Sequence, residues 1–556
     1  MSTRTLASRR NPFRQFDFWN YVTIAAFILI AFFLIYPLFN IFLNSFWQDG
    51  KVSLENYQEF FSYKYYYSAL LNSIIVSTAA TFFACLLGIP VAYVMSRFNI
   101  PFKGFFHILI ILTLLSPPFI GAYSWILMLG NNGFITNFFR DFGIDMPSIY
   151  GLHGMIWVFT LQFYPHIYLY VSGALKTIDV SLEEASASLG VSGFQRIRKV
   201  TLPLIFPTVS TGALMVFMAS FADFGTPMLI GQGEKVLPIL AYEQFISEMG
   251  SNPAMASTLS MILLAVTTTV LFVQRYVVTK KTYTMSALRP PKIIKLAGTK
   301  RVFATLFVTA VVALSIIPQA TVITTSFLKT NGPVFAGGFS LDSYREVLYK
   351  VPQAITNTFM YASIAIVIMV FAGLLLSYVV VRRKSKITSL LDALIMIPYV
   401  IPGTVLGISL IIAFNKPPIE LTGTWVILVI AYVIRKLPYT MRSSTAILHQ
   451  IDKSVEEASI SLGVPPMRTF FKTTAILMIP GVLSGAILSW VTTINELSST
   501  IVLYYGATRT ITVSIYSEVF TSNFGTAAAL ASILSLTTII SLIIINIISG
   551  KKDVTI

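Results

Sequence analysis

The sequence predicts an all-α integral membrane protein of about twelve transmembrane helices, arranged as two parallel repeats of six. The composition is 55% hydrophobic and only 11% charged, with a mean hydropathy of +0.76, whereas soluble domains are about 25% charged. Apolar runs long enough to cross a bilayer recur along the chain, and one polar segment occurs twice. A single cysteine, Cys85, and four scattered histidines exclude a disulfide scaffold and a structural zinc site.

The formal net charge of +16 admits two explanations. A basic balance is common in nucleic-acid-binding proteins, but membrane proteins also concentrate Lys and Arg in cytoplasmic loops, close to anionic lipid headgroups. Because the chain is so apolar, we favour the second explanation and predict membrane lipid, not nucleic acid, as a partner.

Twelve runs meet the length of roughly 20 mainly apolar residues that a helix needs to cross about 30 Å of hydrocarbon. The fourth, fifth, tenth and eleventh are interrupted by polar or proline residues. The predicted spans are 20–45, 68–96, 104–130, 150–175, 206–230, 254–278, 302–326, 354–381, 388–414, 424–448, 475–505 and 525–549.

Basic residues gather in every second connection between these spans, while the other connections are sparse or acidic. Since cytoplasmic loops carry the excess of Lys and Arg, both termini are predicted to lie in the cytoplasm. The arginines before the first run and the missing cleavage site after it predict a retained anchor, not a signal peptide. The basic residues are Arg97, Lys103, Arg196, Arg198, Lys199, Arg275, Lys280, Lys281, Arg289, Lys292, Lys295, Lys300, Arg301, Arg382, Arg383, Lys384, Lys386, Arg468, Lys472, Lys551 and Lys552.

The chain contains an internal repeat. Residues 178–191 recur as residues 451–464, with eleven of fourteen positions identical. Most matching residues are polar, so two apolar helices would not match in this way by chance. Upstream matches pair Asn72 with Asn357, Gly88 with Gly373, Tyr93 with Tyr378 and Arg97 with Arg382.

The repeat divides the chain into two halves of the same orientation, because each half holds an even number of spans. We expect a first half over residues 1–278, a cytoplasmic linker over 279–301 and a second half over 302–556. The linker is rich in Lys and Arg and contains Pro290 and Pro291.

The repeated segment is predicted to form a helical hairpin on the cytoplasmic side, over about 177–203 in the first half and 450–476 in the second. Ser181 with Glu184, and Ser454 with Glu457, match the capping-box pattern of a helix start. A glycine follows where a left-handed helix end is favoured. We expect exposed glutamates on a surface of small residues, which a partner can approach closely, and two copies indicate two similar soluble partners. The glutamates are Glu183 and Glu456, and the glycines are Gly190 and Gly463.

The pattern Glu-Glu-Ala-x-x-x-Leu-Gly with a downstream basic stretch and Leu-Pro, at residues 183–203, resembles the EAA loop of ATP-binding-cassette (ABC) importer permeases. The second copy, at 456–463, departs from it further on, where Ile476 replaces Pro203. In that family the loop carries a coupling helix that docks in a cleft of the ATPase subunit. The matching residues are Glu183, Glu184, Ala185, Gly190, Glu456, Glu457, Ala458 and Gly463.

The resemblance also implies partners. The sequence has no Gly-x-x-x-x-Gly-Lys-Ser/Thr phosphate loop, so we expect no catalytic residues and no cofactor in this chain. ATP and Mg would be used by two copies of a separate ABC ATPase subunit, and an extracytoplasmic substrate-binding protein would deliver the substrate. The expected location is the bacterial inner membrane.

Two carboxylates at matching depth mark a candidate substrate path. Asp223 and Glu496 are related by the same spacing as the repeat, near the outer end of the fifth span of each half. Facing each other, they would form an oxygen-rich constriction suited to transient binding of a hard metal ion. Alternatively, each caps a broken helix or pairs with a cation; Arg435 and Lys436 interrupt the tenth span, and the candidate acceptors of a salt bridge from them are Glu496 and Asp392.

The fused layout, with Asp-Phe-Gly-Thr-Pro at 223–227 and Asn-Glu-Leu at 495–497, looks like the ferric-iron permease group of ABC importers. Thiamine, aminoethylphosphonate and polyamine permeases remain alternatives. From other classes, an ion-gradient-driven secondary transporter of six plus six spans also has parallel halves, and a passive channel is a third hypothesis. Neither explains the twin acidic hairpins.

Overall fold

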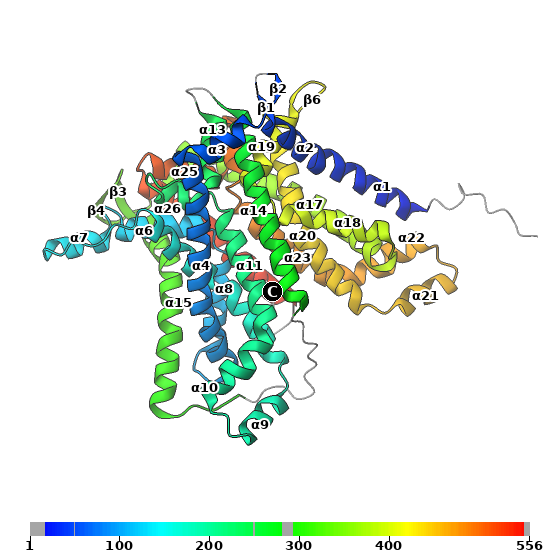
Figure 1. Ribbon diagram of the computed structural model, residues 1–556, viewed down its shortest axis with the longest axis horizontal. Coiled ribbons are helices and arrows are strands. Elements are labelled where there is room, and N and C mark those ends of the chain that lie inside the picture. The colour runs from blue at the N-terminus through cyan, green and yellow to red at the C-terminus, as the bar shows by residue number, and fades with distance from the viewer. Residues whose placement is uncertain (1–16, 49, 248–250, 281–292, 550–556) are drawn as a thin grey trace, which may run out of the picture.

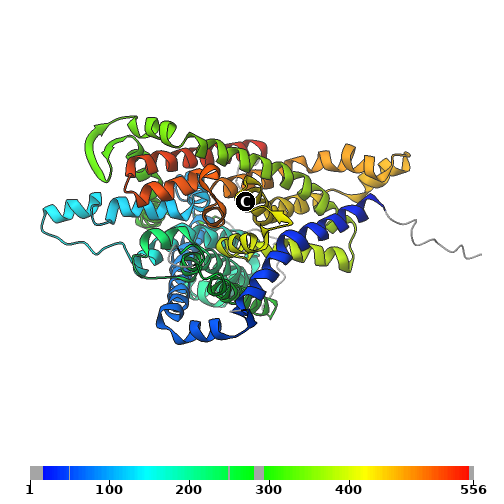
Figure 2. The same ribbon diagram turned by 90° about the horizontal axis from the view of Figure 1, so that it is seen from above.

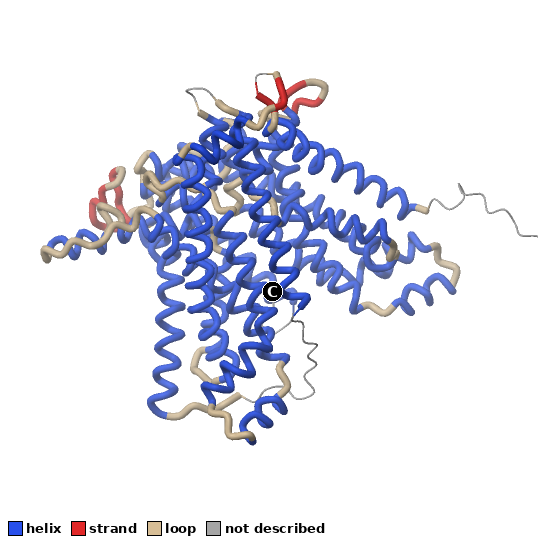
Figure 3. The backbone as a smooth tube through the Cα atoms, viewed as in Figure 1, coloured by secondary structure: helices blue, strands red, loops and turns tan. Residues whose placement is uncertain are grey.

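The computed structural model describes residues 17–48, 50–247, 251–280 and 293–549, and nearly all of this part is helical (Figures 1 and 3). Within it, eight helices are long and apolar enough to cross a membrane, or up to ten when each of two sharply bent pairs counts as one span. Two more helices, α8 and α20, have 26 residues each but are more polar. The all-α membrane architecture is confirmed, and the number twelve stays a prediction.

The first half begins with α1, which continues through a π turn (Ala31–Ile35) into α2. A second π turn (Ile197–Thr201) joins α10 to α11. The helices are α1 (Phe18–Ile30), α2 (Tyr36–Ser45), α3 (Glu55–Ser62), α4 (Lys64–Arg97), α5 (Lys103–Leu115), α6 (Pro118–Leu129), α7 (Phe134–Asp141), α8 (Leu152–Thr177), α9 (Val180–Ser188), α10 (Gly193–Arg196), α11 (Leu202–Phe221), α12 (Gly225–Ile230), α13 (Leu237–Ile246) and α14 (Pro253–Lys280).

The second half repeats this order, including a π turn (Phe470–Thr474) between α22 and α23. Its helices are α15 (Gly298–Ser326), α16 (Asp342–Lys350), α17 (Pro352–Arg382), α18 (Lys386–Met396), α19 (Gly403–Phe414), α20 (Trp425–Gln450), α21 (Lys453–Ser461), α22 (Pro466–Thr469), α23 (Ala475–Ile494), α24 (Thr500–Leu503), α25 (Ile511–Phe520) and α26 (Phe524–Ser549).

Strands are confined to three short antiparallel hairpins in the described chain. They connect helices at the upper and left edges of Figure 1. They are β1 (Trp47–Gln48) with β2 (Lys51–Val52), β3 (Leu328–Asn331) with β4 (Val334–Phe339), and β5 (Asn415–Lys416) with β6 (Ile419–Glu420).

The third and ninth predicted spans are not straight. The chain bends by 100° between α5 and α6 and by 106° between α18 and α19. Proline lacks a backbone N–H and restricts the residue before it, and the breaks fall at Pro117-Pro118 and at Pro402. In contrast, α8 and α20 continue through the single prolines Pro165 and Pro438.

The first helix of each half lies against the other half. The α1–α2 helix packs on α17, α18 and α19, and α15 packs on α5 and α6. Figures 1 and 2 show α1 leaving the first half and running along the second. The halves of the sequence are therefore interlocked in space. The boundaries 1–278, 279–301 and 302–556 stay a prediction; α14 continues to Lys280, α15 begins at Gly298, and residues 281–292 lie outside the described chain.

Glycines let the long helices cross closely at equivalent points of the two halves. At Gly88 in α4, a Cβ atom would lie 2.6 Å from Cβ of Ile167 and 2.9 Å from the carbonyl oxygen of Tyr164 in α8. At Gly373 in α17, it would lie 2.9 Å from Cγ2 of Thr440 in α20. The match of Gly88 with Gly373 in the sequence thus marks two equivalent helix contacts.

Gly88→Val should therefore lower the thermal unfolding temperature of the purified protein, because the larger side chain forces α4 and α8 apart. Overpacking of this kind costs about 1–3 kcal/mol. Gly104→Val is the matched control, since no heavy atom lies within 4 Å of the corresponding Cβ position. Equal unfolding temperatures for the two variants would contradict the close crossing.

Candidate functional site

A cavity of about 280 Å³ lies where helix breaks of both halves meet. The breaks are those between α5 and α6, α11 and α12, α18 and α19, and α23 and α24. The polar lining includes Ser116, His166, Asp223, Tyr399, Arg435, Lys436, Tyr439, Thr492, Asn495, Glu496 and Ser498.

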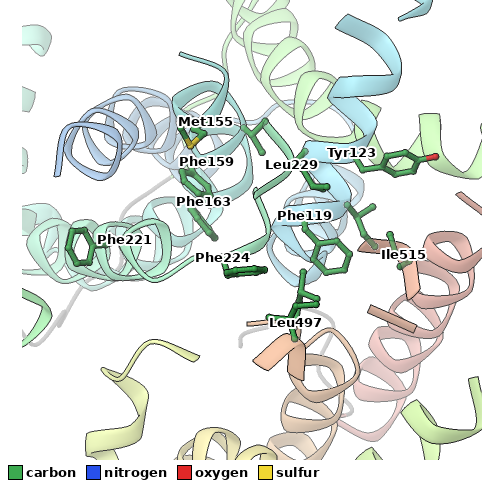
Figure 4. Close-up of a cluster of buried hydrophobic side chains, with 14 of the residues drawn as sticks. Phe119, Tyr123, Met155, Phe159, Phe163, Phe221, Phe224, Leu229, Leu497 and Ile515 are labelled. Atoms are coloured by element: carbon green, nitrogen blue, oxygen red, sulfur yellow. The ribbon is translucent and has the colours of Figure 1, made fainter. Parts of the chain in front are cut away.

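An apolar cluster borders this cavity. Phe119 from α6 and Leu497 from the α23–α24 break line it, and Phe224 from the α11–α12 break lies beside them (Figure 4). All three side chains are buried, and a Cβ added at Gly225 would lie 2.6 Å from Cβ of Phe119. Residues of both halves thus pack tightly at one side of the polar space.

Asp223 lies in the break between α11 and α12 and caps the helix that follows. Its Oδ2 accepts the backbone N–H of Thr226 at 2.8 Å. The first N–H groups of a helix have no partner within the helix, and membrane hydrocarbon offers no water to satisfy them. A carboxylate at this position supplies the acceptor.

Glu496 takes the same role in the second half and is also paired with two cations. Its Oε1 accepts the backbone N–H of Ser499 at 3.1 Å and its hydroxyl at 3.2 Å. Arg435 forms an ion pair with Oε1, and Nζ of Lys436 lies 2.8 Å from Oε2. The Glu496 side chain is only 5% exposed, so these partners compensate a buried charge.

Both alternatives to the metal-binding hypothesis are therefore realised: each carboxylate caps a broken helix, and Glu496 pairs with Arg435 and Lys436. Two carboxylates face two cations, so the side chains of this cavity do not give it the excess negative charge expected from Asp223 and Glu496 alone. Nowhere in the described part of the chain do three His, Cys, Asp or Glu side chains come together in a group able to hold a metal ion.

Gln162 satisfies a helix break next to this cavity, a role that the sequence did not predict. It occupies the place in the first half that Arg435 occupies in the second. Its Nε2 donates to the carbonyl oxygens of Thr113 at 2.7 Å and Ser116 at 2.6 Å, where α5 ends. The sequence signal for this role was an amide side chain within a mainly apolar span.

The two predicted coupling loops form α9 and α21, each followed by a glycine turn and a second helix. Gly190 and Gly463 have φ of +76° and +86°, as predicted for a left-handed helix end. Figure 1 shows α9 and α21 at the ends of two diverging arms of the molecule. The glycine turn is confirmed in both copies.

The predicted capping residues, Ser181 and Ser454, are wrong. The helices begin two residues earlier, and the caps are Asp179 and Asp452, which accept the N–H of Ser181 at 2.8 Å and of Ser454 at 2.9 Å. The hydrogen bond from Ser454 lowers the pKa of the Asp452 carboxyl. An Asp two residues before the serine reaches the same free N–H groups first.

Glu456 is buried, which corrects the expectation that it faces a partner. Its Oε1 accepts Nε of Arg382 at 2.9 Å and its Oε2 accepts the hydroxyl of Tyr378 at 3.0 Å. Arg382 also donates to the carbonyl oxygen of Ile451 at 2.8 Å. The end of α17 is thereby fastened to α21. The side chain of Glu183, the counterpart of Glu456, lies outside the described part of the structure.

The remaining predicted coupling residues lie on exposed surface. In α9 and its turn these are Glu184, Ala185 and Gly190; in α21 and its turn they are Glu457, Ala458 and Gly463. An exposed helix with small residues offers a surface that a partner can approach.

An aromatic cluster connects α21 with the first helix of the chain. Trp19 of α1 stacks on Tyr378 with ring centroids 4.2 Å apart, and Phe470 lies 4.8 Å from both rings. In the first half, Ile197 stands at the position of Phe470. The network Trp19–Tyr378–Glu456–Arg382 joins α1, α17 and α21.

The duplicated broken helices, the cavity between them and the two exposed hairpins are features of a membrane transport subunit. Residues 84–283 and 369–553 each match the same family, described as binding-protein-dependent transport system inner membrane component. The chain belongs to this family of ABC importer permeases and carries its domain twice.

Relatives that match across most of this chain share the fused arrangement. The chain is 31% identical over 522 residues to the ferric transport system permease protein FbpB of Actinobacillus pleuropneumoniae, covering 91% of this chain and 75% of that protein. It is 30% identical over 497 residues to the putative ferric transport system permease protein FbpB 1 of Haemophilus influenzae, covering 87% and 77%. A spermidine/putrescine transport system permease protein, PotB of H. influenzae, is 30% identical over 218 residues, which cover 38% of this chain and 76% of PotB.

Glu456→Ala should loosen α21, because Arg382 loses its carboxylate partner in a buried environment. Breaking a buried ion pair costs about 3–5 kcal/mol, so amide hydrogen exchange in α21 should accelerate. Glu457→Ala is the matched control, since its exposed side chain is next in sequence and such changes stay within about 0.5 kcal/mol. The same exchange rates in both variants would count against the Glu456–Arg382 connection.

Removing the two cavity carboxylates should have unequal effects on stability. Glu496→Ala leaves Arg435 and Lys436 without their carboxylate, at a cost of about 3–5 kcal/mol. Asp223→Ala removes a helix cap, which costs about 1 kcal/mol. Thermal unfolding of the two purified variants measures the difference. An equally large loss of stability in Asp223→Ala would show that the ion pairs of Glu496 are not the main source of the difference expected between the two variants.

Proposed function

We propose that this permease moves ferric iron into the cytoplasm as part of an ATP-driven importer. The assignment of ferric iron as the substrate rests on one observation. Two relatives named as ferric transport permeases match across both halves at about 30% identity. The iron is substrate, not a resident cofactor. Asp223 retains an oxygen, Oδ1, beyond the one that caps α12, and this oxygen is the candidate for transient contact with a hard cation.

The proposed partners follow from the two coupling helices. One ABC ATPase subunit would bind α9 and its turn, through Glu184, Ala185 and Gly190. A second would bind α21 and its turn, through Glu457, Ala458 and Gly463. The ATPases use ATP and Mg, and an extracytoplasmic binding protein delivers the substrate. Glu456 would act from within the permease by holding α21 to α17, whereas Glu183 is proposed to contact the ATPase, as the resemblance implies.

The basic connections support an orientation with α9, α21 and both termini in the cytoplasm. Closure of the ATPase pair would draw α9 and α21 together. Because Glu456 and Arg382 fasten α21 to α17, this movement would reach the membrane helices and reshape the cavity between the halves.

A polyamine remains a second candidate substrate because of the similarity to PotB. It is less favoured, since that match covers 38% of this chain. The family match in both halves rules out the ion-gradient-driven transporter and the passive channel.

Reconstitution decides the substrate. The permease, together with its cognate ATPase and binding protein, should import radiolabelled ferric iron into liposomes in an ATP-dependent manner. Asp223→Asn should slow iron uptake several-fold at unchanged protein content, because amide oxygen is a weaker ligand for a hard cation. Uptake of spermidine but not iron would overturn the assignment, and unchanged iron uptake by Asp223→Asn would remove this residue from the path.

Coupling is tested separately from substrate. Ala185→Trp together with Ala458→Trp places bulk on both exposed coupling surfaces and should abolish binding of the ATPase and substrate-stimulated ATP hydrolysis. Ser389→Trp, at an exposed position of α18, is the control. Normal ATPase binding by the double variant, measured by co-purification, would show that α9 and α21 are not the contact surfaces.

A further inference from the structure

An apolar groove of about 480 Å³ lies between α1 and the second half, beside the places where they are in contact. Its walls come from α1, α17, α18 and α20, and its exposed lining is almost wholly apolar. Along α1 and the π turn that follows it, the groove extends from Val22 to Leu34, which is about 18 Å of helix. One leaflet of a bilayer has about 15 Å of hydrocarbon, so the groove has the length of one lipid chain.

The helices around this groove are membrane spans, which determines what surrounds it. The α1–α2 helix and α17 are among those long and apolar enough to cross a bilayer. An apolar groove at this depth is filled by acyl chains, because water finds no polar partner there. Leu29 and Ile368, which line the groove, are also substantially exposed, so a lipid acyl chain can enter the groove from the bilayer.

An apolar stripe on α18 leads from basic residues into the groove. Ile387 and Leu390 are exposed, and Leu394, one turn further, lines the groove. These positions follow the spacing of one helix face. Lys384 and Lys386 stand exposed at the start of the stripe. Basic groups at the end of an apolar groove match the negative headgroup of an anionic phospholipid.

The two crossing helices differ in how they are held. On the first half, α15 is fixed by hydrogen bonds: the Ser315 hydroxyl lies 3.1 Å from that of Tyr164, and Ser124 donates to the carbonyl of Pro318 at 2.8 Å. At its start, α1 is tied to the second half by the ion pair of Asp17 with Arg383, but along the groove it meets the second half through apolar side chains. A lipid acyl chain in this groove would supply to α1 the packing that α15 obtains from neighbouring side chains of the protein.

We propose that one anionic phospholipid occupies this groove, with an acyl chain between α1 and α20 and its headgroup at Lys384 and Lys386. The groove backs directly onto the polar cavity. Pro398, Ile434 and Leu437 line the groove, and their neighbours Tyr399, Arg435 and Lys436 line the cavity. The lipid therefore supports the rear of the helices that hold Glu496, whatever the transported substrate is.

The test uses the purified full chain, depleted of lipid in mild detergent and titrated with phosphatidylglycerol or phosphatidylcholine. Phosphatidylglycerol should raise the thermal unfolding temperature, with saturation near one lipid per chain in native mass spectrometry. Phosphatidylcholine should do so only at several-fold higher concentration. Equal effects of the two lipids would overturn the headgroup assignment. If neither lipid changes the unfolding temperature, the lipid site itself is overturned. That result is also expected if another polypeptide fills the groove.

Variants locate the site. Ala372→Trp fills the groove from α17 and should abolish the phosphatidylglycerol shift, whereas Leu86→Trp, at an exposed position of α4, should retain it. If Ala372→Trp does not fold, Ala25→Phe on the opposite wall gives the same test. Lys384→Gln with Lys386→Gln should reduce the response to phosphatidylglycerol to that of phosphatidylcholine. A full shift in the groove variant would place the lipid elsewhere.

Discussion

The hydrogen-bonding demand of broken helices inside a membrane governs this structure. Each break frees backbone groups, and hydrocarbon provides no water for them. Polar side chains near the breaks form the missing hydrogen bonds. Asp223 and Glu496 accept backbone N–H groups, and Gln162 donates to the carbonyl groups at the end of α5. The polar cavity exists because these groups converge where the halves meet. Two carboxylates and two cationic side chains line the cavity, so their charges balance in number. The ion pairs and helix caps that they form also stabilise the fold.

Residues that maintain the architecture thus also line the proposed substrate path. Glu496 holds a helix start, forms ion pairs with Arg435 and Lys436, and lines the cavity. A movement that separates α20 from the α23–α24 break would have to exchange these ion pairs for others. The buried pair between Glu456 and Arg382 places a similar constraint at the other end of the second half, where α21 cannot move without α17.

Features with a local sequence pattern were predictable. The membrane class, the repeat, the two hairpins and their glycine turns all follow from hydropathy, spacing and glycine geometry. Glu456 is different: its burial depends on Arg382, 74 positions away, and Tyr378, 78 positions away, and no local pattern reports such a pairing. The cap was misplaced because Asp and Ser both accept backbone N–H groups, and only the backbone decides which one does. The crossing of α1 onto the second half has no local signal either.

The crossing of α1 has a consequence for biosynthesis. Trp19 is among the first residues of α1 to leave the ribosome, but its stacking partners are Tyr378 and Phe470. At about 5–20 residues per second, synthesis of residues 20–469 takes roughly 20–90 s. Throughout that interval the leading span has no completed docking surface and stays within the insertion machinery or the surrounding lipid. Final assembly of this polypeptide is therefore delayed until nearly the whole message has been translated.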